Sequence, residues 1–516
     1  MSLQLAESFT NGASSNQTKA GGGNSLILRP KSLSALFFCA ALASTPAWCQ
    51  YAPGGAAPAA GTTQSSEPSA PAASSPPTQG GNFSGSVPSQ PVPGVLSLSL
   101  QDAIDRGLKQ NLGLLLSSAD IDTARGQRYQ QLSALLPHVN LQPYADISQV
   151  NLAEFGFTFH FPGVNIPTVV GPFAYFDARA YLTQSLFDLK SLSNTHAASE
   201  RIKSAEYTYK DARDLVVQTV GYAYLQAVAD EAFINAVDAQ VNTAQALYNQ
   251  ASDQVNAGTS PAIDALRAKV ELQTRQQQLI QAKNDFAIQK LSLARVIGLA
   301  AGQQFDLTDK SLYQAFETPS VDEAIKRALM SRSDFQAALA NVRAAEYARR
   351  AATAGRYPTL SFGGNYGDSG QHFNASHGVF DVRGTLTVPL FTGGSVRGDE
   401  VQADAQLQQA RERLENLRGQ IDSDVRVALF NLESASQQVA VAQSNIDLAQ
   451  QSLTQSRDRF AAGVTDTVEV VQAQEAVATA NQSYISSLYT YNYAKISLAR
   501  ATGAAEEGVK EYFKGK

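Results

Sequence analysis

The chain has 516 residues, of which 44% are hydrophobic and 17% are charged, and its formal net charge is −6. This acidic balance, without any basic stripe, argues against a nucleic-acid-binding protein. No apolar run reaches the roughly 18 residues that a membrane-spanning helix needs, so we expect no such helix.

The first 95 residues are expected to form a leader and a tail. Residues 1–49 resemble a secretory leader region, because Arg29 and Lys31 precede the apolar stretch Leu33 to Leu42 and small residues follow it. Residues 50–95 are rich in Pro, Ala, Gly, Ser and Thr. We expect them to be disordered, because this composition buries little apolar surface.

Beyond residue 95 the chain contains the same unit twice. Asp102-Ala103-Ile104 returns as Glu323-Ala324-Ile325, displaced by 221 positions, and Ser292-Leu293-Ala294-Arg295 returns unchanged 205 positions later. We therefore expect two structural repeats, 96–300 and 317–503, and a C-terminal tail, 504–516. The repeated unit is far longer than a solenoid repeat, and its duplication indicates a symmetric assembly.

Each repeat contains one long helical pattern. In the second copy this pattern runs from Val396 to Ala462, where large and small residues alternate at heptad spacing. The first copy has an equivalent pattern, and both break the heptad at the same place, from Val216 to Val220 and from Ile421 to Val425. Because the two breaks lie at the same height, we expect the two long helices to stand side by side.

Two helices of about half that length flank each long helix. They are expected at Leu100–Leu136 and Pro261–Leu299 in the first copy, and at Val321–Tyr357 and Thr467–Thr502 in the second. A short helix before the long one and another after it predict that the two short helices stack end to end alongside it.

Two alternating stretches separate the first short helix from the long helix in each copy. Phe380, Val382 and Leu386, for example, alternate with polar residues. About ten such residues are typical of a transmembrane β-strand. A soluble hairpin with one solvent-exposed face is an alternative. Four strands cannot close a barrel, and open edges are not tolerated in lipid. We therefore expect a mostly α fold, with an internally duplicated α-helical coiled-coil barrel and a transmembrane β-barrel that closes in a trimer.

The sequence resembles the TolC-like outer-membrane efflux channels from about Leu98 to Gly503. The segments Leu182-Thr183-Gln184-Ser185-Leu186-Phe187-Asp188 and Val388-Pro389-Leu390-Phe391-Thr392-Gly393-Gly394 are similar to the two strand-to-helix joints of that family. The resemblance implies a homotrimer in the cell outer membrane that extends into the periplasm. It also implies a passive exit duct of a tripartite efflux or type I secretion system, docking to a periplasmic adaptor and an inner-membrane pump.

The resemblance also implies roles for the two helix reversals. The expected adaptor-contact tips are Gly258, Thr259 and Ser260 in the first copy and Gly463, Val464 and Thr465 in the second. Asp264 and Glu469 match acidic positions that narrow the tunnel of the family at its periplasmic end. Gln472 stands where the family has a further gate carboxylate, and Thr465 stands where it has a gate-locking Arg. How the closed state of this channel is locked is therefore left undecided by the sequence.

No constellation in the sequence indicates an enzyme, a cofactor or a metal site. The two cysteines, Cys39 and Cys49, lie in the leader region, and whether Cys49 carries a lipid is open. The histidines are scattered; they are His138, His160, His196, His372 and His377. A structural periplasmic coiled-coil or adaptor protein without a pore is the alternative function, but it has no need of lipid-facing strands.

Overall fold

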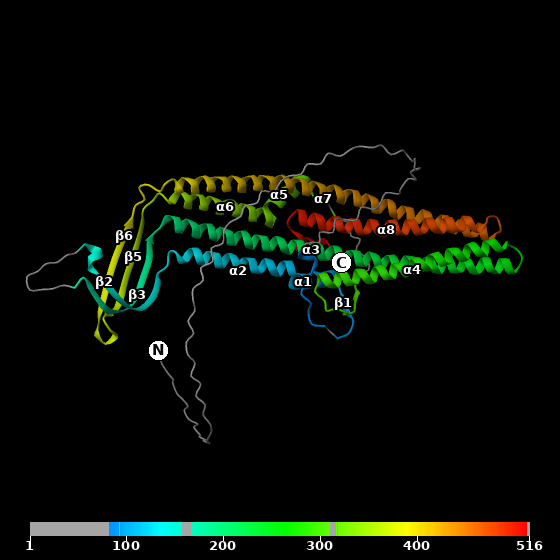
Figure 1. Cartoon of the computed structure of the whole chain (residues 1–516). Coiled ribbons are helices and arrows are strands. Elements are labelled where there is room, and N and C mark those ends of the chain that lie inside the picture. The colour runs from blue at the N-terminus through cyan, green and yellow to red at the C-terminus, as the bar shows by residue number, and fades with distance from the viewer. Residues whose placement is uncertain (1–81, 92, 157–166, 310–315, 317, 513–516) are drawn as a thin grey trace, which may run out of the picture. The chain divides into compact units, whose positions relative to one another are not determined.

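The computed structural model describes residues 82–91, 93–156, 167–309, 316 and 318–512. The predicted leader, most of the predicted disordered tail, both cysteines and His160 lie outside this part of the chain. The described part is mostly helical and carries a small sheet, as the sequence predicted (Figure 1).

The helices repeat with the displacements found in the sequence. The first copy contains α1 (Leu100–Gln110), α2 (Leu112–Ser133), α3 (Leu189–Asn256) and α4 (Ala262–Val296). The second contains α5 (Val321–Ser331), α6 (Ser333–Ala354), α7 (Ser395–Ala461) and α8 (Thr467–Ala501), and α9 (Ala505–Tyr512) follows. The long helices α3 and α7 have 68 and 67 residues, so each extends for roughly 100 Å at 1.5 Å per residue.

The first short helix of each copy was expected to be continuous, and this prediction was wrong. Asn111 interrupts the first with extended backbone angles (φ −64°, ψ 128°), and Arg332 interrupts the second in the same way (φ −62°, ψ 122°). The Asn111 side chain accepts a hydrogen bond from the backbone N–H of Gly113 and so caps α2. Each interruption therefore ends one helix and starts the next.

The short helices pack end to end along the long ones, as predicted (Figure 1). In the first copy, α1 and α2 lie against one half of α3 and α4 lies against the other. In the second copy, α5 and α6 lie against one half of α7 and α8 against the other.

The two long helices are not packed side by side, so that prediction was wrong. Helices α6 and α8 both pack against α3 as well as α7, while the ion pair Lys190–Asp399 (3.4 Å) joins only the first turns of the long helices. The shared heptad break shows that the two long helices change their winding at the same distance along their length. It does not show which helices are neighbours. The predicted seam of α7 is nevertheless buried, at Ile421, Val425, Ala428, Leu432, Ala435, Val439, Ala442 and Ile446.

The sheet contains the four predicted strands. They are β2 (His138–Asn151), β3 (Val169–Phe187), β5 (Thr359–Gly370) and β6 (Ser376–Thr387), antiparallel in the order β2-β3-β5-β6. A separate parallel pair joins β1 (Leu96–Leu98) to β4 (Phe305–Leu307). None of the described helices is both long and apolar enough to cross a membrane.

Disorder was predicted for residues 50–95, but the C-terminal part of this segment is ordered in the structure. The backbone N–H of Val87 donates to Gln110 and that of Ser89 donates to Gly298, so this segment bridges the ends of α1 and α4. The amide of Asn111 donates to the carbonyl of Phe83 at 2.7 Å. These local hydrogen bonds order a segment whose composition alone predicts disorder.

Candidate functional site

Both helix reversals are closed by the same backbone motif. After α3, Gly258 (φ 69°) donates to the carbonyl of Val255 and Thr259 donates to that of Gln254. After α7, Gly463 (φ 71°) donates to Phe460 and Val464 to Arg459. This pair of bonds is the Schellman motif, which needs a residue with positive φ and therefore favours glycine. The two tips thus present the same backbone and differ in their side chains.

The two carboxylates expected at the aperture occupy equivalent positions just after the tips. Asp264 is the third residue of α4, and Glu469 is the third residue of α8. A negative charge in the first turn is favourable because the unpaired N–H groups there carry partial positive charge. This placement explains locally why both copies have an acid at this position.

Three neighbouring side chains hold the Glu469 carboxylate. Thr465 Oγ1 donates to its Oε2 at 2.5 Å, Ser456 Oγ lies 3.4 Å from its Oε1, and Arg459 Nε lies 3.2 Å from the same oxygen. The side chain is 38% exposed. Thr465 therefore stabilises this end of the helix, because its hydrogen bond ties the start of α8 to the tip.

The other two aperture candidates differ sharply in exposure. The Asp264 side chain is only 9% exposed and lies 3.7 Å from Arg267 on its own helix. Gln472 is exposed. Within one chain, Glu469 and Gln472 therefore present polar groups to solvent, whereas Asp264 is largely covered.

The strands carry one apolar face and one polar face in register. One row across the sheet pairs Leu141 with Ala180, Ala180 with Tyr366 and Tyr366 with Phe380. The three large side chains of this row are at least 70% exposed: Leu141 70%, Tyr366 71% and Phe380 76%. Such an apolar face on a sheet is typical of strands that face lipid.

The opposite face of the sheet is polar. Asp177 is fully buried there, where Arg179 lies 2.5 Å away and Tyr175 donates to it at 2.9 Å. Arg179 also donates to Asn365 on the neighbouring strand at 3.4 Å. Asp177 and Arg179 are therefore paired with each other within the sheet.

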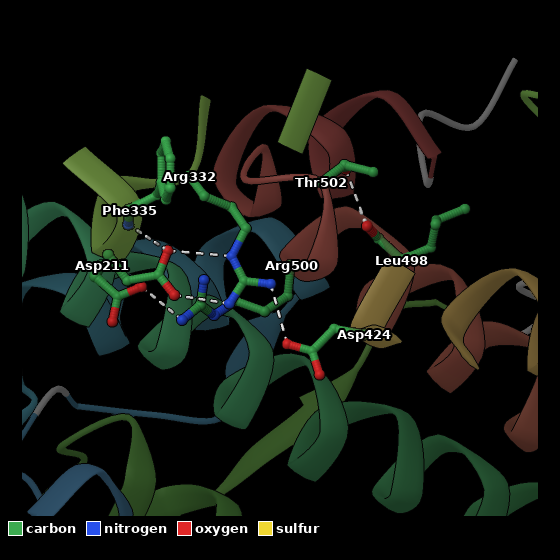
Figure 2. Close-up of polar contacts among 8 residues, drawn as sticks. Asp211, Arg332, Phe335, Asp424, Leu498, Arg500 and Thr502 are labelled. Atoms are coloured by element: carbon green, nitrogen blue, oxygen red, sulfur yellow. Dashed lines mark hydrogen bonds and ion pairs between the residues drawn. The ribbon is translucent and has the colours of Figure 1, made fainter. Parts of the chain in front are cut away.

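Sequence reasoning missed a cluster of buried charges where the two copies meet near the middle of the rods (Figure 2). Arg332 donates from Nη2 to Asp334 at 2.7 Å and from Nη1 to Asp424 at 3.1 Å, and its side chain is 6% exposed. Arg500 of α8 donates to Asp211 of α3 at 2.5 Å. The cluster ties α3, α6, α7 and α8 together. Arg500 ends the repeated Ser-Leu-Ala-Arg segment, but nothing in that repeat indicates a pairing with Asp211, and Arg332 stands in no motif.

Burial and the neighbouring arginines act in opposite directions on the pKa values of this cluster. Burial alone would raise the pKa of Asp334, but the hydrogen bonds and charge of Arg332 outweigh it and hold that pKa below its usual value. For Asp211, burial prevails over the charge of Arg500 and raises the pKa. Burial raises the pKa of the neighbouring Asp214 to about 6, and this carboxylate accepts a hydrogen bond from the backbone of Glu506.

In the part of the chain that the structure describes, no group of three or more His, Cys, Asp or Glu side chains is arranged to hold a metal ion. The candidate site therefore consists of the two tips with their carboxylates and the two-faced sheet at the other end of the rods.

The outer membrane efflux protein family matches residues 103–299 and 324–504 of the chain. Outer membrane protein TolC of Vibrio cholerae is 22% identical over 411 residues, covering 77% of this chain and 89% of the relative. Outer membrane protein OprJ of Pseudomonas aeruginosa is 25% identical over 447 residues, covering 80% and 86%.

The fold is also similar to a solved structure, that of the Campylobacter jejuni CmeC outer membrane channel. The TM-score is 0.68 at 18% sequence identity, and the match covers 80% of this chain and 89% of that one. The family match spans most of both copies of the repeat, including the two strands that each copy contributes to the sheet.

Proposed function

The chain belongs to the outer membrane efflux protein family, and we propose that three copies of it close into a passive exit duct across the outer membrane and the periplasm. Its place is the outer membrane, and its function is efflux. The trimer, the docking partners and the roles of the tip residues are the parts that we propose.

The open edges of the sheet support the trimer most directly. β2 has β3 as its one neighbour in the sheet of the described chain, and β6 has β5. The two edges are therefore free, and unpaired backbone groups in lipid cost several kcal/mol each. The edge strand β2 of one copy can pair with the edge strand β6 of the next copy. Because the two strands are different, this contact is head-to-tail, and repeated head-to-tail contacts leave no free edge only when the copies form a closed ring. Three copies supply twelve strands, enough for a closed barrel whose interior is not filled by side chains.

Two apolar helix faces support the same ring. On α4 the exposed fractions are 71% for Ile280, 58% for Ile288 and 67% for Leu291, which lie nearly as far from the tips as the exposed residues of α7. On α7, Phe430 (64%) and Val441 (61%) are exposed on the outside of the predicted seam. Each stripe lacks a partner in its own chain, so α4 of one copy would pack against α7 of the next.

The tips and carboxylates take their proposed roles from this arrangement. Gly258, Thr259 and Ser260 with Gly463, Val464 and Thr465 would form the surface that a periplasmic adaptor contacts, with an inner-membrane pump behind it. Asp264, Glu469 and Gln472 would line the narrow end of the tunnel. The exposed side chain of Val464 (69%) and the partly exposed Glu469 support these assignments.

A periplasmic coiled-coil protein without a pore would leave the apolar face of the sheet unexplained. We expect no catalytic activity and no cofactor, since the relatives are named as outer membrane proteins and channels.

The test is to purify the full chain in detergent and to measure its mass by light scattering with correction for the detergent. We expect three chains per particle, and single channels after reconstitution into planar bilayers. A stable monomer with protease-resistant strands would contradict the trimer, and a trimer without conductance would contradict the duct.

A further inference from the structure

The two copies of the repeat form their hairpins with the same register. In the first copy His138 lies opposite Thr183, and in the second copy Thr359 lies opposite Thr387. The first strand of the hairpin is therefore displaced by 221 positions between the copies, from 138 to 359, and the second strand by 204, from 183 to 387. These displacements relate the residues of β2 to those of β5, and the residues of β3 to those of β6.

The contact between the two copies inside one chain is a template for a contact between chains. Strand β3 of the first copy pairs with β5 of the second. The strands with free edges are their equivalents, since β6 corresponds to β3 and β2 corresponds to β5. In a closed ring of repeats each repeat meets its neighbour in a similar way, so β6 of one chain would meet β2 of the next as β3 meets β5.

The two displacements give the register of this contact between chains. Within the chain, Arg179 lies opposite Gly367. The residue equivalent to Arg179 on β6 is Arg383, and the residue equivalent to Gly367 on β2 is Asp146. The template therefore places a cation of one chain directly opposite an anion of another.

The two faces of the sheet agree with this register. Asp146 lies opposite Tyr175 on the polar face, and Arg383 follows Val382 of the apolar face, so its side chain points to the polar face as well. The adjacent pair in the same register joins Val382 to Ile147, which are 65% and 76% exposed. A register that differed by one residue would place apolar side chains opposite polar ones.

Each edge strand has a charged side chain that a second chain can pair. The Arg383 side chain is 72% exposed, and its Nη2 lies 3.6 Å from Asp381 on the same strand. Asp146 is exposed, and it forms no ion pair within the part of the chain that the structure describes. On the inner strand β3, by contrast, Arg179 is 24% exposed and lies 2.5 Å from the fully buried Asp177.

The helices support the same arrangement. Tyr222 of α3 stacks on Tyr493 of α8, with ring centroids 3.7 Å apart. The helices of the two copies are displaced by 205 positions, so the equivalent residues are Val427 of α7 and Ile288 of α4. Their side chains are 52% and 58% exposed. An aromatic contact between the copies thus corresponds to two apolar side chains that a single chain leaves exposed.

We propose that β6 of one chain pairs with β2 of a second copy in this register, so that Arg383 forms an ion pair with Asp146 of the partner subunit on the polar face of the sheet. Opposite charges directly across two strands stabilise their pairing. The contact rests on the proposed function, because it needs a ring of chains. It goes beyond that function, since it fixes which residues meet and gives the ring an ion pair that a single chain does not contain.

Disulfide cross-linking tests the register. One variant carries Arg383→Cys with Asp146→Cys, and a second carries Val382→Cys with Ile147→Cys. Directly opposed residues alternate between close non-hydrogen-bonded pairs and wider hydrogen-bonded ones, so one of these two adjacent pairs has the closer spacing. After mild oxidation of the full chain, we expect covalent dimers and trimers on a denaturing gel without reducing agent in at least one of the two variants.

The background of both variants is the full chain with Cys39 and Cys49, its only cysteines, changed to Ser. In the matched controls the β2 cysteine is moved by two residues on the same face, to Tyr144 or to Ala145. Residues offset by two positions lie about 7–8 Å apart across the strands, too far for an unstrained disulfide. We expect at least about fivefold less cross-linked product in these controls.

A charge reversal tests the ion pair itself. Arg383→Glu or Asp146→Arg alone would place like charges opposite each other and should speed the dissociation of the trimer by at least about threefold. The loss of the trimer band during incubation in sodium dodecyl sulfate measures this rate. The double variant restores an opposite pair and should return the rate close to that of the unchanged chain. If Arg383 paired only with Asp381 of its own chain, the double variant would dissociate as fast as Arg383→Glu.

The mass of the reduced particles is measured in parallel by light scattering. A trimer in which neither pair cross-links better than its offset control would overturn the register and leave the duct standing. A double variant that does not recover would overturn the ion pair. A monomeric particle would contradict the proposed duct and the contact together.

Discussion

Asn111 and Arg332 stand 221 residues apart at the same position of the two copies, and each ends a helix of 11 residues with nearly the same backbone angles. Their side chains are held differently. Asn111 is fixed by Phe83 of the N-terminal segment, and Arg332 by the carboxylates of Asp334 and Asp424. The interruption therefore belongs to the architecture, while the contacts that stabilise it have diverged.

The first prediction concerns Arg332. Arg332→Met would leave the half-buried carboxylates of Asp334 and Asp424 without their cation, and we expect a loss of about 1–3 kcal/mol in the free energy of unfolding. Urea unfolding followed by circular dichroism measures it. Arg411→Met, which removes an exposed pair with Glu346, should cost at most about 1 kcal/mol. Equal losses in the two variants would contradict a stabilising role for the buried cluster.

The second prediction is a pH dependence. The pKa of Asp214 is about 6 in the folded chain against an ordinary value of 3.8, so the folded state holds the proton more tightly. The stability that this proton provides is complete below pH 3.8 and is lost as the pH rises through 6. Asp214→Asn should therefore be more stable than the wild type at pH 7.5, by up to about 3 kcal/mol.

Urea unfolding of both proteins from pH 4 to pH 8 measures this difference, which should shrink toward pH 4. The groups that face Asp214 are Asp211, Arg500 and Glu506, and they are unchanged in both proteins. The exposed Asp238→Asn on the same helix is the control. A difference that does not vary with pH would show that Asp214 does not titrate in this range.

The third prediction concerns the seam of α7. Ala442 is 5% exposed, so Ala442→Leu would overpack the helix pair and should cost about 1–3 kcal/mol. Val441→Leu, at the neighbouring position that is 61% exposed, is the matched control. A thermal melt of Ala442→Leu that coincides with that of the control would mean that this seam is not closely packed.

The fourth prediction separates the two faces of the sheet. Val382 lies on the apolar face and is 65% exposed, whereas Thr385 lies on the polar face of the same strand. Val382→Arg would place a charge against lipid at a cost of about 2–4 kcal/mol, and we expect less protein in the outer-membrane fraction of a sucrose gradient. Thr385→Arg should insert normally. Equal recovery of the two variants would argue against a lipid-facing sheet.

The fifth prediction tests the charge of the aperture. Three Glu469 carboxylates in a trimer would converge near the tips, and close carboxylates attract cations and repel anions. Glu469→Gln should therefore reduce cation selectivity in planar bilayers, while Gln472→Ala should not. Reversal potentials that stay unchanged under a salt gradient would mean that Glu469 faces away from the pore.

Periodicity predicted the helices and the strands well. The expected start of α5 at Val321 and of α8 at Thr467 agrees with the structure, because heptad spacing and alternation record which face of an element is buried. The interruptions at Asn111 and Arg332 were missed because neither residue is a proline or a glycine. Their extended backbone depends on distant partners, such as Phe83 and Asp424, that local spacing does not reveal.

The candidate site was predictable only in part. The glycines of the tips are visible in the sequence because a helix reversal needs positive φ. The contact between Arg500 and Asp211 joins residues 289 positions apart, and no periodicity connects them. Side chains that act across two hairpins are thus found only after the hairpins are placed together.

Helices α4 and α8 have the same length, 35 residues each. In a trimer, the two kinds of hairpin would therefore end at similar levels and form one surface that a partner could contact. Each chain would supply two hairpin ends, so the ring would approach sixfold rotational order while keeping only threefold symmetry. Successive ends would alternate between Thr259-Ser260-Pro261 and Val464-Thr465-Asp466, which differ by one negative charge. Six identical partner molecules arranged around this ring would therefore occupy two classes of position and bind with two affinities.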